Sequence, residues 1–325
     1  MLFRSESIAK KNGFKGVRTN CKVVRLWKDE KSGRFVGVEV KTGGKTINIR
    51  ANRGIVLGAG GYARDVKFRM SQVPFLTEAY NSTNQPSATA ETLMMAQAAG
   101  ASTLHLAFIQ LFPTADAKTG SIDRPALFPI QFPGFGAVYV DKNGKRFVSE
   151  LGRRDVVSQA ETKTGGKCTW CVFNAQVYSK LTDKAEMDKF VATGRLKTGK
   201  TLDELAAAMQ VPAAALKATI AEHNGFVRDG KDPKFGKPIS KAMAQMTEGP
   251  YYAVSQWPSV HHCQGGVRIN PKAQMIDIFG NVMPGLYAAG EFVGGVHGDN
   301  RLGGNAIADC IVFGRVAGKN AASKA

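Results

Sequence analysis

The densest group of residues capable of chemistry lies near the end of the sequence, in the stretch VHGDNRLGGNAIADC at positions 296–310. A histidine, an aspartate and an arginine stand among glycines there, and an apolar run follows at 307–313. We expect a helix from Ala306 to Ala317 with Asn305 as its N-cap. The free N–H groups of its first turn would face whatever the glycines admit. The stretch therefore predicts a site for an anion or an electron-rich ring.

A second glycine-rich stretch, GIVLGAGGYARD at 54–65, ends a β-branched run and resembles part of a dinucleotide-binding turn. The dinucleotide fingerprint needs the spacing G-x-G-x-x-G, an amphipathic helix and an acidic residue about twenty positions later. Here YARDVKFRM follows the glycines, and the spacing differs. The stretch by itself does not identify a Rossmann nucleotide site.

The composition is that of a globular protein with a sizeable core. The 325 residues are 43% hydrophobic, enough for one large or two medium domains. The net charge is +18, but the lysines and arginines are scattered singly, so we expect no nucleic-acid partner. The five cysteines, at positions 21, 168, 171, 263 and 310, have no framework spacing. We expect neither structural disulfides nor a metal site.

The first residues, MLFRSESIAKKNGFKG, lack the apolar core of a signal peptide, and no apolar stretch approaches the length that spans a bilayer. We therefore expect a soluble protein without a membrane span, in the periplasm or cytoplasm of a bacterium. The segment SESIAKKNGF is typical of the end of an amphipathic helix that closes on Gly13. On this interpretation the chain begins abruptly, inside a domain.

Two glycine-rich parts with strand patterns flank a middle of different composition. The middle contains a segment rich in proline and aromatic residues and a strand–turn–strand pattern with Asn143-Gly144 in the turn. It also contains two short helices, one with a capping box from Thr201 to Glu204, and His223 is expected at their surface. We predict an α/β fold in which a partial, Rossmann-like nucleotide-binding domain at 1–98 and 247–325 receives an α+β capping domain at 99–246.

Five segments together resemble one family. They are STNQP at 82–86, FIQLFPT at 108–114, NGKRFVSELGRRD at 143–155, HHCQGGVRI at 261–269, and GLYAAGEFVGGVHGDNRLGGNAIADCIVFGRVAG at 285–318. The chain is similar to the flavoprotein subunit of the fumarate reductase and succinate dehydrogenase family, nearest the flavocytochrome-type fumarate and urocanate reductases. The order of HHxxGG, GE and RLGGNA is specific, whereas any one of these motifs alone is not.

The resemblance implies a non-covalent FAD beside a substrate with an electron-poor C=C bond. Hydride passes from flavin N5 to one carbon, and a proton passes to the other. Arg154 is similar to the arginine that supplies this proton. Arginine is a poor acid, so the role requires a desolvated site and a carboxylate relay. The alternative for Arg154 is a surface salt bridge with Asp155 or Glu150.

The same resemblance implies the other site residues. His261 and Arg301 match the clamp for a substrate carboxylate, Gly304 gives it a backbone contact, and Phe112 faces the substrate. The alternative for the two adjacent histidines is that they only fill the end of a strand. The residues that match FAD contacts are Val23, Ala59, Gly60, Gly61, Glu91, His262, Glu291, Ala306 and Ile307. The helix from Ala306 would direct its positive end at the flavin edge formed by N1 and C2=O.

The chain departs from the family at the substrate end. Glu91 stands where an aspartate is usual, and Phe112 replaces a histidine that meets the far carboxylate. Ile130 and Pro133 occupy the positions of a glutamate and an arginine that bind substrate and relay the proton. We expect a second carboxylate to have no partner. Phe112 and its aromatic neighbours Phe128, Phe132 and Phe135 would instead surround an apolar tail.

The family's N-terminal part, with its G-x-G-x-x-G turn and the acidic residue for the ribose, has no match in this chain. We therefore expect a missing N-terminal half that supplies the pyrophosphate site. The chain alone should bind FAD weakly or not at all.

Three functions remain open at this stage. The first is an FAD-dependent reductase of a 2-enoate, not optimised for fumarate, that receives electrons from a haem-type or flavin-type protein or domain. The second is a truncated or non-catalytic remnant of a flavoprotein. The third is a ketosteroid or enone dehydrogenase of the same superfamily, which is disfavoured because Arg301 and His261 would have no carboxylate to hold.

Overall fold

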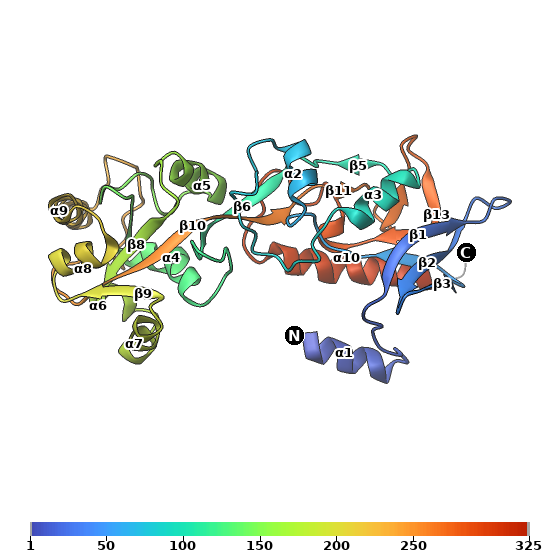
Figure 1. The fold of residues 1–325 in the computed structure, drawn as a ribbon, viewed down its shortest axis with the longest axis horizontal. Helices are drawn as coiled ribbons and strands as arrows, with labels where there is room; N and C mark the ends of the chain where they lie inside the picture. Colours follow the sequence, from blue (N-terminus) through green and yellow to red (C-terminus); the bar gives the residue numbers. More distant parts are fainter. Residues whose placement is uncertain (1, 324–325) are drawn as a thin grey trace.

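The computed structural model describes residues 2–323 and has two lobes joined by two long strands (Figure 1). We name the lobes by their hydrophobic cores. The core of the base is drawn from residues 26–111 and 260–293, and the core of the cap from residues 128–254. Strands β6 (Ile109–Ala115) and β10 (Tyr251–Cys263) pair antiparallel and pass from one lobe to the other. The junction of the lobes is therefore a continuous two-stranded ribbon.

The base contains three small sheets. Strands β1 (Lys22–Lys28), β2 (Phe35–Thr42) and β3 (Lys45–Arg50) form an antiparallel meander. In the second sheet, β13 (Val282–Ala288) lies between β12 (Gln274–Ile276) and the edge strand β4 (Ile55–Leu57), which it pairs in parallel. Strands β5 (Thr103–Leu104) and β11 (Gly266–Val267) form the third. Segments from both ends of the chain thus build one lobe. The exact domain boundaries at 99 and 247 stay a prediction.

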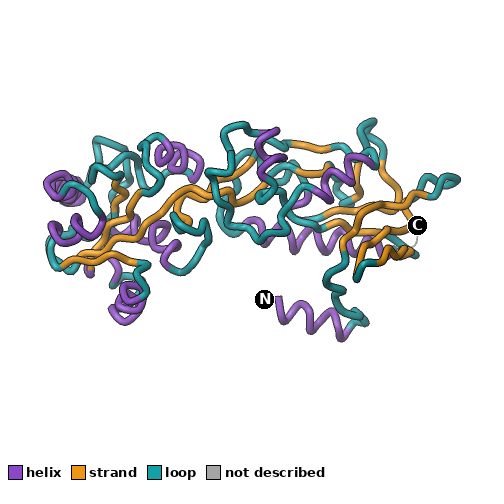
Figure 2. Tube along the Cα trace, viewed as in Figure 1, coloured by secondary structure: helices purple, strands orange, loops and turns teal. Residues whose placement is uncertain are grey.

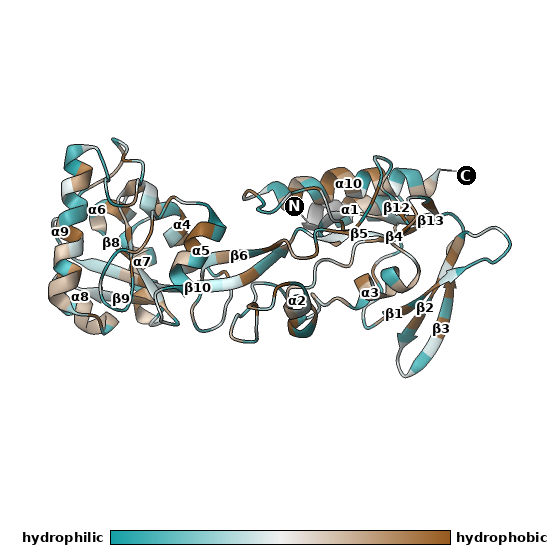
Figure 3. Ribbon diagram, turned by 90° about the horizontal axis from the view of Figure 1, so that it is seen from above, coloured by the Kyte–Doolittle hydropathy of each residue, from teal (hydrophilic) through white to brown (hydrophobic). Residues whose placement is uncertain are grey.

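The helices of the base are α1 (Leu2–Lys11), α2 (Val66–Gln72), α3 (Glu91–Ala98), the short 3-10 helix η3 (Gly290–Phe292) and α10 (Asn305–Ala322). The expected N-cap at Asn305 is wrong by one residue, because Gly304 is the N-cap residue and Asn305 is the first residue of the helix. Figure 3 shows α10 lying along the base, with hydrophobic segments on it.

The apolar run at the start of α10 is less buried than its composition suggests. Asp309, Ala317 and Ala321 are its buried residues, spaced by multiples of four so that they form one narrow stripe. The side chains of Ile307, Ile311 and Val312 lie off that stripe and are 57%, 45% and 54% exposed. A continuous apolar run on a helix faces all directions, and a single sheet covers only one of them.

The cap is a five-stranded antiparallel sheet covered by helices on both faces (Figure 2). The strand order is β6, β10, β8 (Thr169–Asn174) and β7 (Val138–Val140), and β9 (Leu196–Gly199) also pairs with β10. The helices are η1 (Pro125–Leu127), α4 (Phe128–Gln131), η2 (Phe132–Phe135), α5 (Arg154–Thr162), α6 (Ala175–Tyr178), α7 (Lys184–Ala192), α8 (Leu202–Met209) and α9 (Ala213–Asp229). An α+β unit is thus inserted between two parts of a mixed base, as the sequence predicts.

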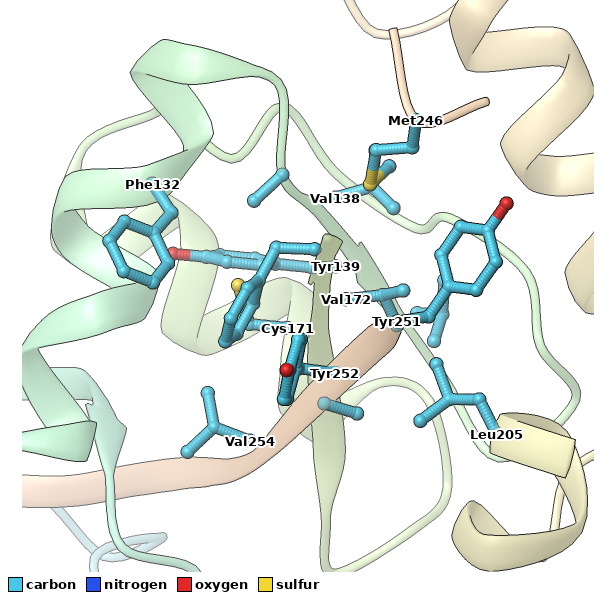
Figure 4. Close-up of a cluster of buried hydrophobic side chains, with 14 of the residues drawn as sticks. Phe132, Val138, Tyr139, Cys171, Val172, Leu205, Met246, Tyr251, Tyr252 and Val254 are labelled. Carbon is cyan, nitrogen blue, oxygen red and sulfur yellow. The ribbon is translucent and has the colours of Figure 1, made fainter. Parts of the chain in front are cut away.

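The core of the cap corrects one expectation about the substrate pocket. Figure 4 shows Phe132 packed in this core with Tyr139 and Tyr252. Phe128 and Phe132 are fully buried and stack at 4.8 Å between ring centroids, and Phe135 packs against the same core. The aromatic segment folds into short helices that point inward, so these rings stabilise the cap and do not line a substrate pocket.

Two further expectations about the cap are wrong. Asn143-Gly144 does form a turn, in which the Asp141 N–H donates to the Lys145 carbonyl, but residues 145–148 form no second strand. His223 is fully buried, because it shares the inward face of α9 with Leu216 and Ile220, and its Nε2 lies 3.1 Å from the Gly136 carbonyl oxygen. A polar residue on a periodic apolar face is easily assigned to the wrong side of a helix.

A buried ionic cluster lies under the α9 side of the cap. The Arg146 guanidinium donates to Glu150 at 2.7 Å and to Asp232 at 2.9 Å, and Lys237 lies 3.3 Å from Glu150. All four side chains are fully buried. Within residues 2–323, no helix is long and apolar enough to cross a membrane.

Candidate active site

Two guanidinium groups meet where the ribbon joins the lobes. Arg154 opens α5 of the cap, and Arg301 lies in the loop before α10 of the base. Both donate to the amide oxygen of Gln110 on β6, at 3.5 Å from Arg154 Nη1 and 3.2 Å from Arg301 Nη2. The Gln110 amide nitrogen donates in turn to Asn300 Oδ1 and to the Arg301 carbonyl, each at 2.7 Å. Gln110 therefore fixes both arginines, although nothing in its residue type singled it out in the sequence.

The electrostatics of this pair are unbalanced. Burial lowers the pKa of Arg154, and the nearby Arg301 lowers it further. Burial also lowers the pKa of Arg301, against the nearby Glu291, which raises it. Among the described residues neither guanidinium forms an ion pair with a carboxylate. Two close cations without an acidic partner create a site that favours an anion. The structure also rejects the surface salt bridge considered for Arg154, because the neighbouring Arg153 makes the bond to Asp155.

His261 and Phe112 complete this group. The His261 and Phe112 rings lie 5.0 Å apart, and the Arg154 guanidinium lies 5.2 Å from the Phe112 ring centroid. Burial, followed by the charges of Arg301 and Arg154, lowers the pKa of His261 to about 3. His261 is therefore a neutral imidazole at neutral pH, suited to hydrogen bonding rather than to ion pairing.

Two residues of the STNQP segment hold His261 in place. Thr83 Oγ1 lies 2.7 Å from His261 Nδ1, and the Asn84 amide donates to the His261 carbonyl at 2.6 Å. These contacts leave Nε2 of the ring available to a ligand. Thr83 and Asn84 belong to a quoted motif but were not predicted as site residues, because their role depends on the packing of that segment against β10.

The glycine-rich loop brings only part of its charge to the site. Gly303 passes so close to Arg154 that a Cβ there would lie 3.2 Å from Nη2, and Gly304 follows in the left-handed conformation with φ of 85°. His297 turns away to Asp309 of α10, 3.1 Å from Nε2 to Oδ2. The carboxylate of Asp299 is 69% exposed and lies 3.8 Å from Arg153. Of the histidine, the aspartate and the arginine at 297–301, only Arg301 lies beside the guanidinium of Arg154.

The residues expected to contact a flavin fall into two groups. Gly61, His262 and Glu291 meet around Cys263, whose N–H donates to Glu291 Oε1 at 2.9 Å; Ala59 and Gly60 directly precede Gly61. Ala306 and Ile307 lie in the first turn of α10, which packs on η3. Val23 and Glu91 form the second group, beside β1, where Lys22 Nζ lies 2.7 Å from Glu91 Oε1. The exposed Glu91 thus pairs with a neighbouring lysine in this structure.

The first group has features that suit a bound nucleotide cofactor. A Cβ on Gly61 would lie 2.4 Å from Glu291 Oε1, so the backbone there can be approached closely only while it is glycine. Both ring nitrogens of the buried His262 lack a partner among the described residues. Burial, followed by Arg301 and His297, lowers the pKa of His262 to about 3, so this ring is neutral. A neutral imidazole and the positive end of α10 are compatible with an electron-rich ring.

Paired guanidinium groups that favour an anion and a glycine-lined group that suits a nucleotide cofactor thus occur together in the base and at its junction with the cap. The chain matches the family described as FAD binding domain over residues 4–307, and it therefore belongs to that family. FAD is accordingly the cofactor, and the resemblance to fumarate reductase and succinate dehydrogenase flavoproteins is confirmed.

The chain is also similar to individual named proteins of this family. The chain is 38% identical over 317 residues to a protein named "Probable fumarate reductase Ifc3" of Shewanella frigidimarina, covering 98% of this chain and 52% of that protein. It is 36% identical over 312 residues to a urocanate reductase of Eggerthella lenta, covering 94% and 50%. The solved open conformation of a flavocytochrome c3 fumarate reductase matches with a TM-score of 0.79 and 36% identity, covering 97% and 54%. The chain thus spans about half the length of these proteins.

Proposed function

We propose that the protein carrying this chain reduces the C=C bond of a 2-enoate that has a single carboxylate. The observation that carries the proposal is the convergence of Arg154 and Arg301 on Gln110, with no ion pair to a carboxylate for either among the described residues. Fumarate reductases and a urocanate reductase among the relatives support the reaction class. Bound FAD, held non-covalently, would supply the hydride.

The substrate carboxylate would lie between Arg301 and His261. Arg301 is 6% exposed and offers a planar fork that meets both carboxylate oxygens, and Gly304 would add a backbone contact. For His261 to donate from Nε2, its Nδ1 must accept the hydroxyl proton of Thr83. In the tautomer that the clamp requires, Thr83 would therefore be the donor of this hydrogen bond.

Arg154 would deliver the proton to the second alkene carbon. Its lowered pKa makes it a better acid than an arginine in water, because burial and Arg301 both disfavour its charged form. The π face of Phe112 at 5.2 Å keeps the guanidinium oriented over the same space. We further propose that an electron-donating protein or domain reduces the FAD between turnovers.

The far end of the substrate would be apolar. Phe112 is 3% exposed and its ring lies 5.0 Å from that of His261, so we expect a second carboxylate to meet an aromatic ring instead of a cation. Burying an unpaired carboxylate costs several kcal/mol. A flat apolar or aromatic tail, in contrast, is stabilised by contact with such a ring.

The experiment is to measure how fast fumarate, acrylate, cinnamate and urocanate reoxidise the reduced flavin of the FAD-loaded protein. We expect the three monocarboxylates to react faster than fumarate. A tenfold or greater preference for fumarate would contradict the single-carboxylate site, and no reaction with any of the four would contradict enoate reduction.

A further inference from the structure

The buried face of α5 carries a line of polar groups that begins at Arg154. Ser158 and Glu161 are both fully buried, and their spacing of four and seven residues from Arg154 places all three on one face of the helix. At 1.5 Å per residue, Glu161 lies about 10 Å along the helix from Arg154. The helix thus connects the proposed acid with a carboxyl group in the interior of the cap.

Glu161 is a buried carboxyl group without a counter-ion. Its Oε1 accepts hydrogen bonds from Thr169 Oγ1 at 2.7 Å and from Gln256 Nε2 at 2.8 Å. Both partners are uncharged, and among the described residues no lysine or arginine pairs with Glu161. Burial raises the pKa of Glu161 to about 8, so the group carries a proton at neutral pH.

Three buried polar atoms at and around Glu161 have unused hydrogen-bonding capacity. Within the described part of the chain, Glu161 Oε2, Ser158 Oγ and Gln256 Oε1 are buried without a partner. Buried polar atoms of this kind are ordinarily satisfied by a bound water molecule, which needs two to four polar neighbours. A structural carboxyl group would be expected to use both oxygens. This one keeps the oxygen that would bear its proton free.

The other end of the cluster lies near the surface of the cap. Thr169 and Gln256 face each other across β8 and β10, and their neighbours Cys168 and Ser255 line a surface cavity of about 620 Å³. Burial raises the pKa of the Cys168 thiol, and the nearby Glu161 raises it further. Glu161, Thr169 and Gln256 do not line this cavity themselves, so a proton from solvent would have to pass from the cavity to the cluster beside Cys168 and Ser255.

A second cavity, of about 210 Å³, lies directly beside Arg154 but offers no comparable proton source. Of its polar lining groups, the Tyr139 hydroxyl donates to the Pro129 carbonyl at 2.5 Å and the Thr114 hydroxyl to the Ala126 carbonyl at 2.9 Å. Burial would raise the pKa of Glu150, but Lys237 and Arg146 outweigh it and keep this carboxylate ionised. The hydroxyl groups of this cavity already donate to carbonyl oxygens, and its carboxylate holds no proton. The Glu161 cluster, in contrast, keeps three polar atoms without a partner among the described residues.

We propose that Glu161 is the proton reservoir that restores Arg154 after each turnover, through the Ser158 hydroxyl and bound water. The inference rests on the proposed function. When the substrate carbon has taken the proton of Arg154, the neutral guanidine takes one from the Glu161 carboxylic acid. The resulting carboxylate then takes a proton from solvent at the surface cavity. One solvent proton is consumed per C=C bond, matching the hydride from reduced FAD.

The first test is spectroscopic and needs no substrate. We expect the infrared spectrum of the chain at pH 7 to contain the C=O band of a protonated carboxylic acid that is absent from Glu161→Gln and present in Glu222→Gln. Glu222 is a matched control, because it is a partly exposed glutamate on α9 paired with Lys234. The band should disappear as the pH rises through about 8. A spectrum without such a band would overturn the proposal.

The second test uses turnover of the FAD-loaded protein with the best enoate. We expect Glu161→Gln to lower kcat at least about tenfold at an unchanged KM and Glu161→Asp to restore part of it. The wild-type kcat should fall above pH 8, and this fall should be missing in Glu161→Gln. Other groups around Glu161 do not titrate near pH 8. The pKa of Cys168 is raised to about 11, and that of Tyr139 on β7 is well above its usual value. The pKa of Asp116, beyond β6, is lowered by Thr119 and Arg195 against the effect of burial.

A third variant separates the two routes to Arg154. Leu151→Trp should narrow the 210 Å³ cavity, which Leu151 lines, without changing kcat. Loss of kcat in this variant with normal kcat in Glu161→Gln would place the route in the cavity and overturn the reservoir. If no enoate reoxidises the wild-type flavin, the proposed function fails and the reservoir with it. Normal turnover in Glu161→Gln overturns the reservoir alone.

Discussion

Arg146 and Arg154 stand eight residues apart in one short segment, yet their surroundings are opposite. Arg146 lies in the cap between Glu150 and Asp232, and these carboxylates raise its pKa against the effect of burial. Arg154 lies at the junction without an acidic partner, beside a second guanidinium, and its pKa is lowered. Removing one partner of a buried charge pair is strongly destabilising, while a buried charge without a partner is a candidate for binding a ligand.

The two regions around these arginines differ in the same way. The core of the cap is aromatic and closely packed, and its ionic cluster satisfies most of its own hydrogen bonds. At the junction, buried polar atoms of His262, Arg301 and Asp309 lack partners among the described residues. Such atoms are costly unless a ligand meets them. The cap also contains unpartnered buried atoms, at Arg146 Nη1 and around Glu161, so the two regions differ chiefly in the carboxylate partners that Arg146 has and Arg154 lacks among the described residues.

The largest effect should come from removing the unpaired arginine. We expect Arg154→Ala to lower the rate of enoate reduction at least 100-fold, since general acid catalysis contributes about 10²–10⁴. Reduction of the flavin by dithionite should be unaffected, because the proton donor acts only afterwards. Stopped-flow reoxidation with an enoate measures the first quantity, and anaerobic titration the second.

The adjacent Arg153 provides the matched control for this variant. Its side chain is 59% exposed and bound to Asp155, so Arg153→Ala should retain activity within about twofold. Substantial turnover in Arg154→Ala, or loss of turnover in Arg153→Ala, would move the acid to Arg153.

Removing the charge from the paired cluster should affect stability instead. We expect Glu150→Gln to lower the free energy of unfolding by about 3 kcal/mol, because it leaves Arg146 and Lys237 buried without full compensation. Urea unfolding measures this difference. Glu222→Gln, on the surface, should change it by less than about 0.5 kcal/mol. An unchanged stability in Glu150→Gln would mean that the cluster does not hold the cap together.

The same cluster predicts the direction of a pH effect. The pKa of Glu150 is lowered from its ordinary value of 4.5, so its contribution to stability is present above pH 4.5 and is lost as the pH falls through the lower, folded-state pKa. Wild-type stability should therefore decline in acid more steeply than that of Glu150→Gln. Parallel curves for the two proteins would contradict this assignment.

The smallest effect concerns the orientation of His261. We expect Thr83→Val, which removes the hydroxyl 2.7 Å from Nδ1 and keeps the shape, to raise KM for a monocarboxylate about tenfold with little change in kcat. Thr46→Val, on the exposed face of β3, is a matched control that should leave KM unchanged. A normal KM in Thr83→Val would remove Thr83 from the clamp.

The sequence was most informative where residue type and motif order coincide. Arg154, Arg301, His261 and Phe112 were all predicted, and the structure brings them together at the junction. Gln110 and Thr83 were missed, although both lie in quoted motifs. Their importance depends on how β6 and the segment at 82–84 pack against β10. Pairing between distant strands cannot be read from one sequence.

Burial was the least predictable property. Phe128 and Phe132 were expected to line a pocket but fill the core of the cap, and His223 was expected at the surface but is buried. Conversely, Ile307 was expected in a buried layer and is more than half exposed. Composition indicates which side chains prefer the interior, but the neighbouring elements decide which of them reach it.

The most direct test of the central claim is a crystal structure of the FAD-loaded protein with 3-phenylpropanoate, the saturated counterpart of cinnamate. The account predicts its carboxylate within hydrogen-bond distance of Arg301 and His261, with the phenyl ring against Phe112 and the Arg154 guanidinium facing the two aliphatic carbons. A carboxylate bound to Arg154, or a ligand seated away from Gln110, would contradict it.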